Sequence, residues 1–269
     1  MLTNLIKLFV LTSLLFILPT KTAFSKAIEN NYSLLDEILG DFYQFYCTKQ
    51  FAKRTVGYGL GGYLANSSVD PHFRNYWQDH LRNDFTNKLS TAINDYSKLT
   101  SYPIAAPIYL ATLWLSTRTF TTSPDTAIGI FANHALRTLV VGAPEQFALT
   151  HFFGSGRPQT EAHRWEVFKY HRAVSGHAFY GAIPLLNLAK QQENPWLKTS
   201  FYVLSALPGL ARVNCDKHYL SQVWLGWWLA NSATQSVWES DIVSNKSNKI
   251  SLEMVPLNSG IYLGLARKF

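Results

Sequence analysis

The chain has 269 residues, of which 47% are hydrophobic and only 15% are charged, and its formal net charge is +7. This composition excludes an intrinsically disordered chain, and the length is enough for one large helical domain or two small ones with a sizeable core. The basic residues are scattered, so no nucleic-acid partner is predicted, whereas a mildly basic chain suits an anionic phospholipid surface.

The first 25 residues have the order of an export signal. Lys7 supplies a positive charge, Leu8–Leu18 is an almost wholly apolar run, and Ala23-Phe24-Ser25 offers small residues for cleavage. The apolar run is short of the ~20 residues that span a bilayer, so cleavage near Lys26 is favoured over an uncleaved anchor. We therefore expect residues 1–25 to be a signal peptide and the protein to be exported, in the periplasm or associated with a cell-envelope membrane.

Residues 26–120 predict a helical segment that packs on the rest of the chain. Apolar residues recur at helical spacing in Tyr32–Phe51. Four glycines between Val56 and Leu64 indicate a close-packing helix or loop, because glycine lets two backbones approach. No strand pattern precedes them and no Lys-Ser/Thr pair ends them, so a nucleotide-binding phosphate loop is not expected.

Two long segments, Leu99–Thr117 and Tyr219–Trp238, contain no charged residue. They keep a polytopic membrane protein open as an alternative. The mean hydropathy of the chain is only −0.03, and Pro103 and Pro107 interrupt the first segment. These observations favour buried helices over membrane spans.

Residues 121–240 are expected to form the core that carries the functional motifs. Ser123-Pro124-Asp125 predicts the start of a helix that runs toward Phe153. Further helices are predicted over Ser175–Lys190, Trp196–Arg212 and Lys217–Trp238. Residues 241–269 predict a C-terminal β-hairpin tail, because two alternating segments flank the turn Pro256–Gly260.

The sequence has two cysteines, Cys47 and Cys215. In an oxidising compartment they could pair, and two free thiols are the alternative.

Three short segments carry the residue types that bind and transfer a phosphoryl group. They are Gly154-Ser155-Gly156-Arg157-Pro158, Val174-Ser175-Gly176-His177, and Arg212 followed by His218. Arginine binds phosphate through parallel hydrogen bonds, and amides at a helix N-terminus also bind anions. Two histidines can supply a nucleophile and an acid near neutral pH.

The order and spacing of these segments resemble the motifs of the type 2 phosphatidic acid phosphatase family, which includes bacterial acid phosphatases and vanadium haloperoxidases. The family motifs are Lys, six residues, Arg-Pro; then Pro-Ser-Gly-His; then Ser-Arg, five residues, His, three residues, Asp. The resemblance covers Ile128 to Trp238. It implies an all-α helical bundle of the phosphatidic acid phosphatase type, a phosphohistidine intermediate, and neither a cofactor nor a catalytic metal.

By position, the resemblance implies that His218 is the nucleophile and His177 the general acid, with Gln222 orienting His218. It also implies that phosphate is bound by Arg157, Arg212, Ser175, Gly176 and Thr150.

Four motif positions depart from the family pattern. Val174 and Ala211 are small changes, but Thr150 replaces the Lys and Gln222 replaces the Asp. The missing cation could come from His151, Arg164, Lys169 or Arg172. The Gln222 oxygen can accept the imidazole N–H but adds no negative charge. In a serine-protease triad, replacing the corresponding Asp by its amide lowers the rate by ~10⁴. An Asp at position 222 is therefore expected to raise the rate, unless the surroundings have been rebuilt around the Gln.

The expected function is that of an exported phosphatase acting on phosphomonoesters. The expected substrates among these are lipid phosphates or lipid-like diphosphates. The expected partners are a phosphate-bearing small molecule or lipid and a membrane surface. A catalytically weak or inactive member that binds phosphate headgroups or has a structural envelope role is one alternative. A phosphotransferase or a vanadate-dependent oxidase on the same scaffold is another.

Overall fold

The computed structural model describes residues 33–117, 126–246, 250–257 and 260–267. Within these ranges the chain is mostly helical, which confirms the all-α class. The expected signal peptide and the predicted helix start at Ser123 lie outside the described residues. None of the helices in the described ranges combines the length and the apolar character that crossing a membrane requires.

The first half of the described chain is a series of helices joined by short turns. Capping boxes begin two of them, because Ser33 accepts from the Asp36 amide and Asn83 accepts from the Thr86 amide. The elements are α2 (Leu34–Tyr46), α3 (Lys49–Asn66), α4 (Val69–Tyr76), the π-helical turn η1 (Trp77–Leu81), α5 (Asp84–Leu99) and α6 (Tyr102–Thr117).

The second half contains the two longest helices of the described residues. Its elements are α7 (Ala127–Phe152), the 3₁₀ turn η2 (Pro158–Thr160), α8 (Gly176–Gln191), α9 (Pro195–Leu204), α10 (Leu207–Asn214), α11 (Leu220–Lys246), and the strands β1 (Ile250–Leu257) and β2 (Gly260–Arg267), which pair antiparallel.

The predicted start at Ser123 is not tested, and within the described residues Thr126 caps α7, which begins at Ala127. The single helix predicted over Trp196–Arg212 is divided into α9 and α10, with Pro208 in the first turn of α10. Proline has no N–H for the carbonyl four residues earlier, so a helix readily ends before it and another begins.

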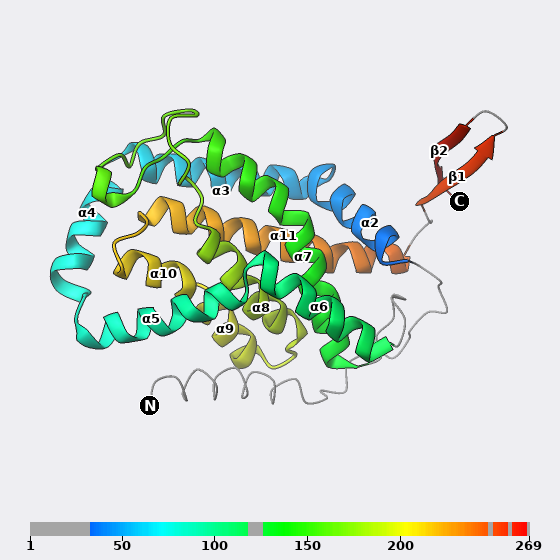
Figure 1. Ribbon diagram of the computed structural model, residues 1–269, viewed down its shortest axis with the longest axis horizontal. Helices are drawn as coiled ribbons and strands as arrows, with labels where there is room; N and C mark the ends of the chain where they lie inside the picture. The colour runs from blue at the N-terminus through cyan, green and yellow to red at the C-terminus, as the bar shows by residue number, and fades with distance from the viewer. Residues whose placement is uncertain (1–32, 118–125, 247–249, 258–259, 268–269) are drawn as a thin grey trace.

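Helix α11 runs through the middle of the molecule and packs against α2, α3, α7 and α8 (Figure 1). Its buried side chains join those of α7 and α8 in the main core, which includes Leu136, Leu139, Phe179, Ile183, Leu186, Leu229 and Ala233.

Glycines of α3 let α11 approach closely, which confirms the close-packing interpretation of this segment. A Cβ on Gly57 would lie 1.9 Å from Nε1 of Trp228, and one on Gly61 would lie 2.6 Å from Leu225. The Trp224 indole donates to the Gly57 carbonyl at 3.0 Å, and the Trp228 indole donates to the Arg54 carbonyl at 3.1 Å. These tryptophans hold α3 against α11.

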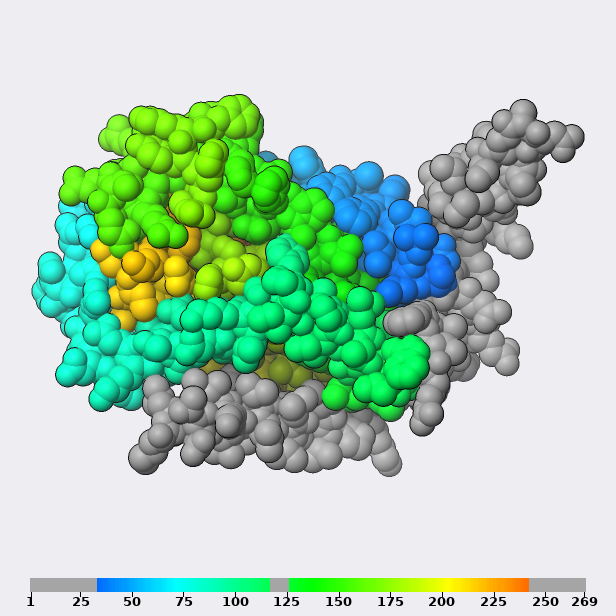
Figure 2. Space-filling model, viewed as in Figure 1, coloured from blue at the N-terminus to red at the C-terminus, as the bar shows by residue number. Residues whose placement is uncertain are grey.

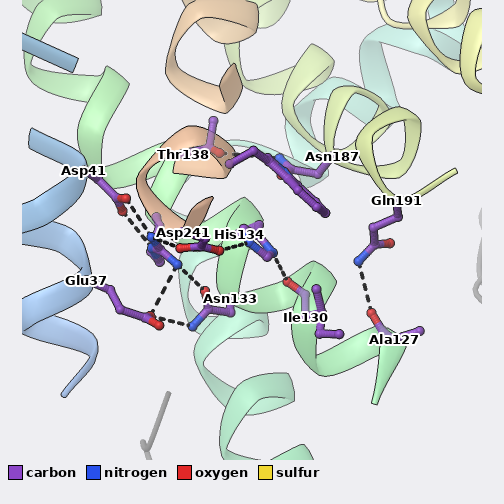
Figure 3. A network of polar contacts seen from close by, with 12 residues as sticks. Glu37, Asp41, Ala127, Ile130, Asn133, His134, Thr138, Asn187, Gln191 and Asp241 are labelled. Carbon is purple, nitrogen blue, oxygen red and sulfur yellow. Dashed lines mark hydrogen bonds and ion pairs between the residues drawn. The ribbon is translucent and has the colours of Figure 1, made fainter. Parts of the chain in front are cut away.

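A buried ionic network joins α2, α7 and α11 (Figure 3). Arg137 donates to both oxygens of Asp41, at 2.7 and 2.6 Å, and to Asp241 at 2.7 Å. His134 contacts Asp241 at 2.6 Å, and Glu37 lies 3.4 Å from Arg137. Burial raises the pKa of Asp41 to about 6, although Arg137 opposes this shift. Removing one partner from such a buried pair typically costs about 3–5 kcal/mol, so the network fixes how these helices are arranged.

Both cysteines are free thiols, so the disulfide that the sequence left open is not formed. Cys47 follows α2 and is exposed, whereas Cys215 follows α10 and accepts a hydrogen bond from Asn94 at 3.4 Å.

Candidate functional site

The fold brings the three motif segments together. They come from the loop after α7, the N-terminus of α8, and the turn between α10 and α11. The Ser175 amide donates to the Gln222 carbonyl at 3.0 Å, and the Gln222 side chain donates to the Gly156 carbonyl at 2.6 Å. Figure 2 shows a recess between the green loop after α7 and the blue-green α5 and α6, with yellow to orange residues at its floor.

The side-chain amide of Gln222 is fully buried and all its hydrogen-bonding positions are occupied. Its Oε1 accepts from the Tyr219 amide at 3.1 Å and lies 2.8 Å from Nδ1 of His218. Its Nε2 donates to the Gly156 carbonyl at 2.6 Å and to Oγ of Ser155 at 2.7 Å. Because an amide N–H can only donate and a carbonyl can only accept, Tyr219 and Gly156 together fix which end of Gln222 is oxygen.

This orientation determines the tautomer of His218. Since Oε1 of Gln222 faces Nδ1 at 2.8 Å, Nδ1 must carry the proton. The expected hydrogen bond from the imidazole to Gln222 is confirmed, even though His218 precedes the first residue of α11. In the neutral ring, Nε2 therefore keeps a free lone pair.

Both histidines resist protonation. Burial lowers the pKa of His218 to about 3, the hydrogen bond with Gln222 opposes the shift, and the charges of Arg212, His177 and Arg157 lower it further. Burial also lowers the pKa of His177 to about 4, with additional lowering by Arg212 and Lys98. His177 and His218 are therefore expected to be neutral at pH 7 when no anion is bound.

Arg157 and Arg212 have buried donors with no acceptor. Nε of each guanidinium is buried and has no hydrogen-bond partner in the described part of the chain. Neither arginine forms a salt bridge with a described residue. Burial lowers the pKa of Arg212, the neighbouring Cys215 opposes this, and Arg157 lowers it further. Two half-buried cations that repel each other and pair with no carboxylate of the described residues are suited to an anion from outside the chain.

The first turn of α8 adds further donors. Ser175 caps the helix and its Oγ accepts from the Ala178 amide at 3.4 Å. The amides of Gly176 and His177 donate to no other described residue, as is usual in a first helical turn. A Cβ on Gly176 would lie 2.9 Å from the Tyr180 ring, so glycine keeps this terminus open. Such a helix N-terminus favours bound anions.

Thr150 is placed differently from the other predicted phosphate ligands. Its hydroxyl lies 2.7 Å from the Gln146 carbonyl and 3.3 Å from the Val174 carbonyl, and it accepts from the Gln146 side chain at 3.0 Å. The single hydroxyl proton is thus directed at a carbonyl oxygen. Phosphate binding by Thr150, which the family resemblance implies, would require that bond to break.

The four cations suggested as replacements for the missing Lys are at the periphery. Lys169 is exposed and paired with Glu166 at 2.5 Å, and Arg164 and Arg172 are exposed. His151 contacts the Phe147 carbonyl at 2.8 Å. Lys98 of α5 also lowers the pKa of His177, but it is exposed and pairs with Asp95 at 2.7 Å.

Sequence reasoning missed several residues that support the site. Asn94 of α5 accepts from Arg212 at 3.3 Å. Ser155 donates to the His163 carbonyl at 3.0 Å while accepting from Gln222 at 2.7 Å. The Tyr180 hydroxyl lies 3.4 Å from Nδ1 of His177. The spacing of Tyr180 from His177, three residues along one helix, is the only local signal among these contacts.

Comparison with known proteins adds no assignment: no family model, no curated protein and no solved structure matches the chain. Within the described ranges, no group of three or more His, Cys, Asp or Glu residues could hold a metal ion.

The lowered histidine pKa values predict that anion binding is linked to protonation. The pKa of His218 in the folded protein lies below the ordinary value of 6.5. The neutral His218 therefore contributes fully to the stability of the fold above pH 6.5, and this contribution is lost as the pH falls toward about 3. Stability therefore falls as the pH is lowered through this range. A bound dianion reverses the effect, because it favours the protonated rings. Sulfate, a dianion throughout, should therefore raise Tm more at pH 5 than at pH 8.

Thermal unfolding with and without sulfate measures this effect. The double variant His177→Ala/His218→Ala controls for the general stabilisation of proteins by sulfate and should show the same Tm increment at both pH values. An equal increment in the wild type would contradict protonation-linked binding.

Proposed function

We propose that the protein is an exported phosphatase that hydrolyses phosphomonoesters through a phosphohistidine on His218. The proposed substrates are lipid phosphates or lipid-like diphosphates. One observation carries this proposal. A histidine with its tautomer fixed by Gln222 lies beside two half-buried arginines whose buried Nε atoms have no partner among the described residues. A neutral nucleophile next to an anion site is the arrangement that phosphoryl transfer requires.

In the first step, Arg157 and Arg212 hold the phosphoryl oxygens, with the Gly176 amide at the α8 N-terminus. The lone pair on Nε2 of His218 forms the P–N bond as the P–O ester bond breaks. His177 gives a proton to the leaving oxygen. The bound dianion makes this possible, because its negative charge raises the pKa of His177 from about 4.

In the second step, water attacks the phosphorus and gives a proton to the now neutral His177. The P–N bond breaks, its electron pair returns to Nε2 of His218, and inorganic phosphate is released. Throughout both steps Nδ1 donates to Gln222, which leaves Nε2 as the ring nitrogen that bonds to phosphorus.

A second candidate is phosphate binding without turnover, and the neutral Gln222 supports it. The phosphorylated imidazole is a cation, and an amide adds no negative charge to stabilise it. The site would then bind headgroups as part of the cell envelope. The oxidase and phosphotransferase alternatives use the same residues and differ in the acceptor or oxidant.

The proposal extends to the finer fold and to the location of the protein. The motif spacing supports a bundle of the phosphatidic acid phosphatase type. The alternating residues near the C-terminus support a native hairpin, and residues 1–25 support export. A phosphate-bearing small molecule or lipid and a membrane surface are the proposed partners, and no cofactor is assigned.

Phosphate release from a panel of soluble monoesters, lipid monophosphates and lipid diphosphates tests the proposal. We expect release with at least one lipid substrate and inhibition by vanadate, because vanadate adopts the five-coordinate geometry of the transition state. Heat-inactivated protein provides the control. Saturable binding of inorganic phosphate with no release from any substrate would support the binding protein instead.

A further inference from the structure

An exposed apolar surface lies next to the site. It consists of the last turns of α7 and the loop 161–172, and we call it the aromatic cap. Its outward side chains are Phe147, Phe152, Val167 and Phe168, which are 67%, 47%, 56% and 66% exposed. In Figure 2 this green segment stands at the rim of the recess. Four large apolar side chains in one place exceed the scattered exposed residues of an ordinary surface.

The aromatic cap is held in a defined conformation by ring contacts and by a close backbone approach. The Phe152 and Phe168 rings meet edge to face at 5.5 Å, and below them Phe153 stacks on Trp165 at 3.8 Å. Gly154 has φ of +57°, and a Cβ there would lie 1.9 Å from the Glu166 carbonyl oxygen. Glycine is therefore required where the loop crosses the end of α7.

Phe168 is held in an unfavourable backbone conformation. Its φ is +62°, in the left-handed region that bulky residues rarely adopt. The turn nevertheless exposes the aromatic ring to solvent. Local backbone strain of this kind is found where a side chain must be presented for function.

Basic side chains lie on the same loop as these apolar side chains. Arg164 and Arg172 are exposed on the same loop, and neither forms a salt bridge with a described residue. Lys169 and Glu166 pair with each other, so the two arginines outnumber the remaining carboxylate, Glu161, and the loop is cationic overall. Aromatic residues flanked by arginines fit the interface of an anionic bilayer, where the rings enter the headgroup region and the guanidiniums bind lipid phosphates.

The cap is also connected to the candidate site. The Glu166 amide donates to the Gly154 carbonyl at 2.9 Å, and the Arg172 amide donates to the Ser155 carbonyl at 3.1 Å. Ser155 in turn holds Gln222. A bilayer that binds the cap would therefore lie close to the candidate site, because the cap is bonded to Gly154 and Ser155 of the segment that ends at Arg157.

From these observations we infer that the aromatic cap docks the protein on an anionic lipid bilayer, with Phe168 and Val167 inserted and Arg164 and Arg172 on the headgroups. The inference deepens the proposed function, on which it rests in part, because a lipid phosphate must be taken from a bilayer. Docking itself requires no turnover, so the two can be tested separately.

Co-sedimentation of the full chain with phosphatidylcholine vesicles, with and without phosphatidylglycerol, tests the docking surface. Phe168→Asn combined with Val167→Ser should weaken binding at least tenfold, and asparagine tolerates the left-handed backbone. Arg164→Gln combined with Arg172→Gln should weaken binding only to the vesicles that contain phosphatidylglycerol. Added salt should do the same.

Phe85→Asn is the matched control, because Phe85 is equally exposed, at 73%, but lies on α5. It should bind like the wild type, as should His218→Ala, whose binding also separates docking from catalysis. All variants share residues 1–32, so any contribution of the expected signal cancels. Unchanged binding of the Phe168 variant would overturn the inference. So would a dimer on a sizing column that this variant converts to monomer, since the cap would then bind a second copy.

Discussion

Replacing His218 by alanine is expected to abolish phosphate release while leaving anion binding largely intact. His218 is the proposed nucleophile, and the loss of a nucleophile from an assembled site costs at least ~10⁴ in kcat. The two arginines remain, with their buried unpartnered Nε donors. Vanadate or phosphate should therefore still bind to the variant.

Phosphate release and isothermal calorimetry with vanadate measure the two properties on the same preparations. Thermal unfolding controls for the small cavity left by a side chain that is 6% exposed. Arg212→Ala is the complementary variant and should lose binding as well as release. Release from the His218 variant at the wild-type rate would contradict the mechanism.

Replacing Gln222 by glutamate is expected to lower both stability and turnover. A glutamate has no N–H, so the Gly156 carbonyl oxygen, now 2.6 Å from Nε2, would face another oxygen. A charged carboxylate buried there keeps the Tyr219 amide and His218 as donors to one oxygen, but it places its other oxygen against the Gly156 carbonyl, which costs several kcal/mol. If it takes up a proton instead, it has one donor for the two acceptors Gly156 and Ser155. Either way the group that fixes the His218 tautomer is displaced, and kcat should fall by ~10² or more.

This expectation revises the one drawn from the family pattern, in which an acidic residue at position 222 would raise the rate. Gln222→Asp should also lower the rate, because its shorter side chain cannot reach both His218 and Gly156. Ser155→Ala is a graded control, since it removes one acceptor and leaves the Gly156 contact. Steady-state kinetics and Tm for the three variants provide the test. A faster, equally stable glutamate variant would show that the amide contacts do not matter.

Much of the candidate site could be predicted because its information is local. Ser175 at a helix start and the spacing of His218 and Gln222 each depend on residues a few positions apart. The helical class followed from apolar periodicity for the same reason. The glycines of α3 also indicated close packing before their partner α11 was known.

The remainder depends on contacts between distant parts of the chain. Asn94 reaches Arg212 across 118 positions, and Gln222 reaches Ser155 across 67. No local pattern pairs such residues, because tertiary packing determines which helix faces meet. The role of Gln222 illustrates the limit. Its sequence position suggested a weakened substitute for Asp, whereas its four hydrogen bonds show surroundings built for an amide.

The most direct test of the proposed mechanism is to trap the intermediate. The wild type is mixed with a phosphomonoester that it hydrolyses, quenched rapidly at alkaline pH, where phosphohistidine is stable, and digested for mass mapping. We predict phosphate on His218 in the wild type and none in His218→Ala. Phosphate on another residue, or rapid release of phosphate with His218 never modified, would contradict a phosphohistidine mechanism at this site.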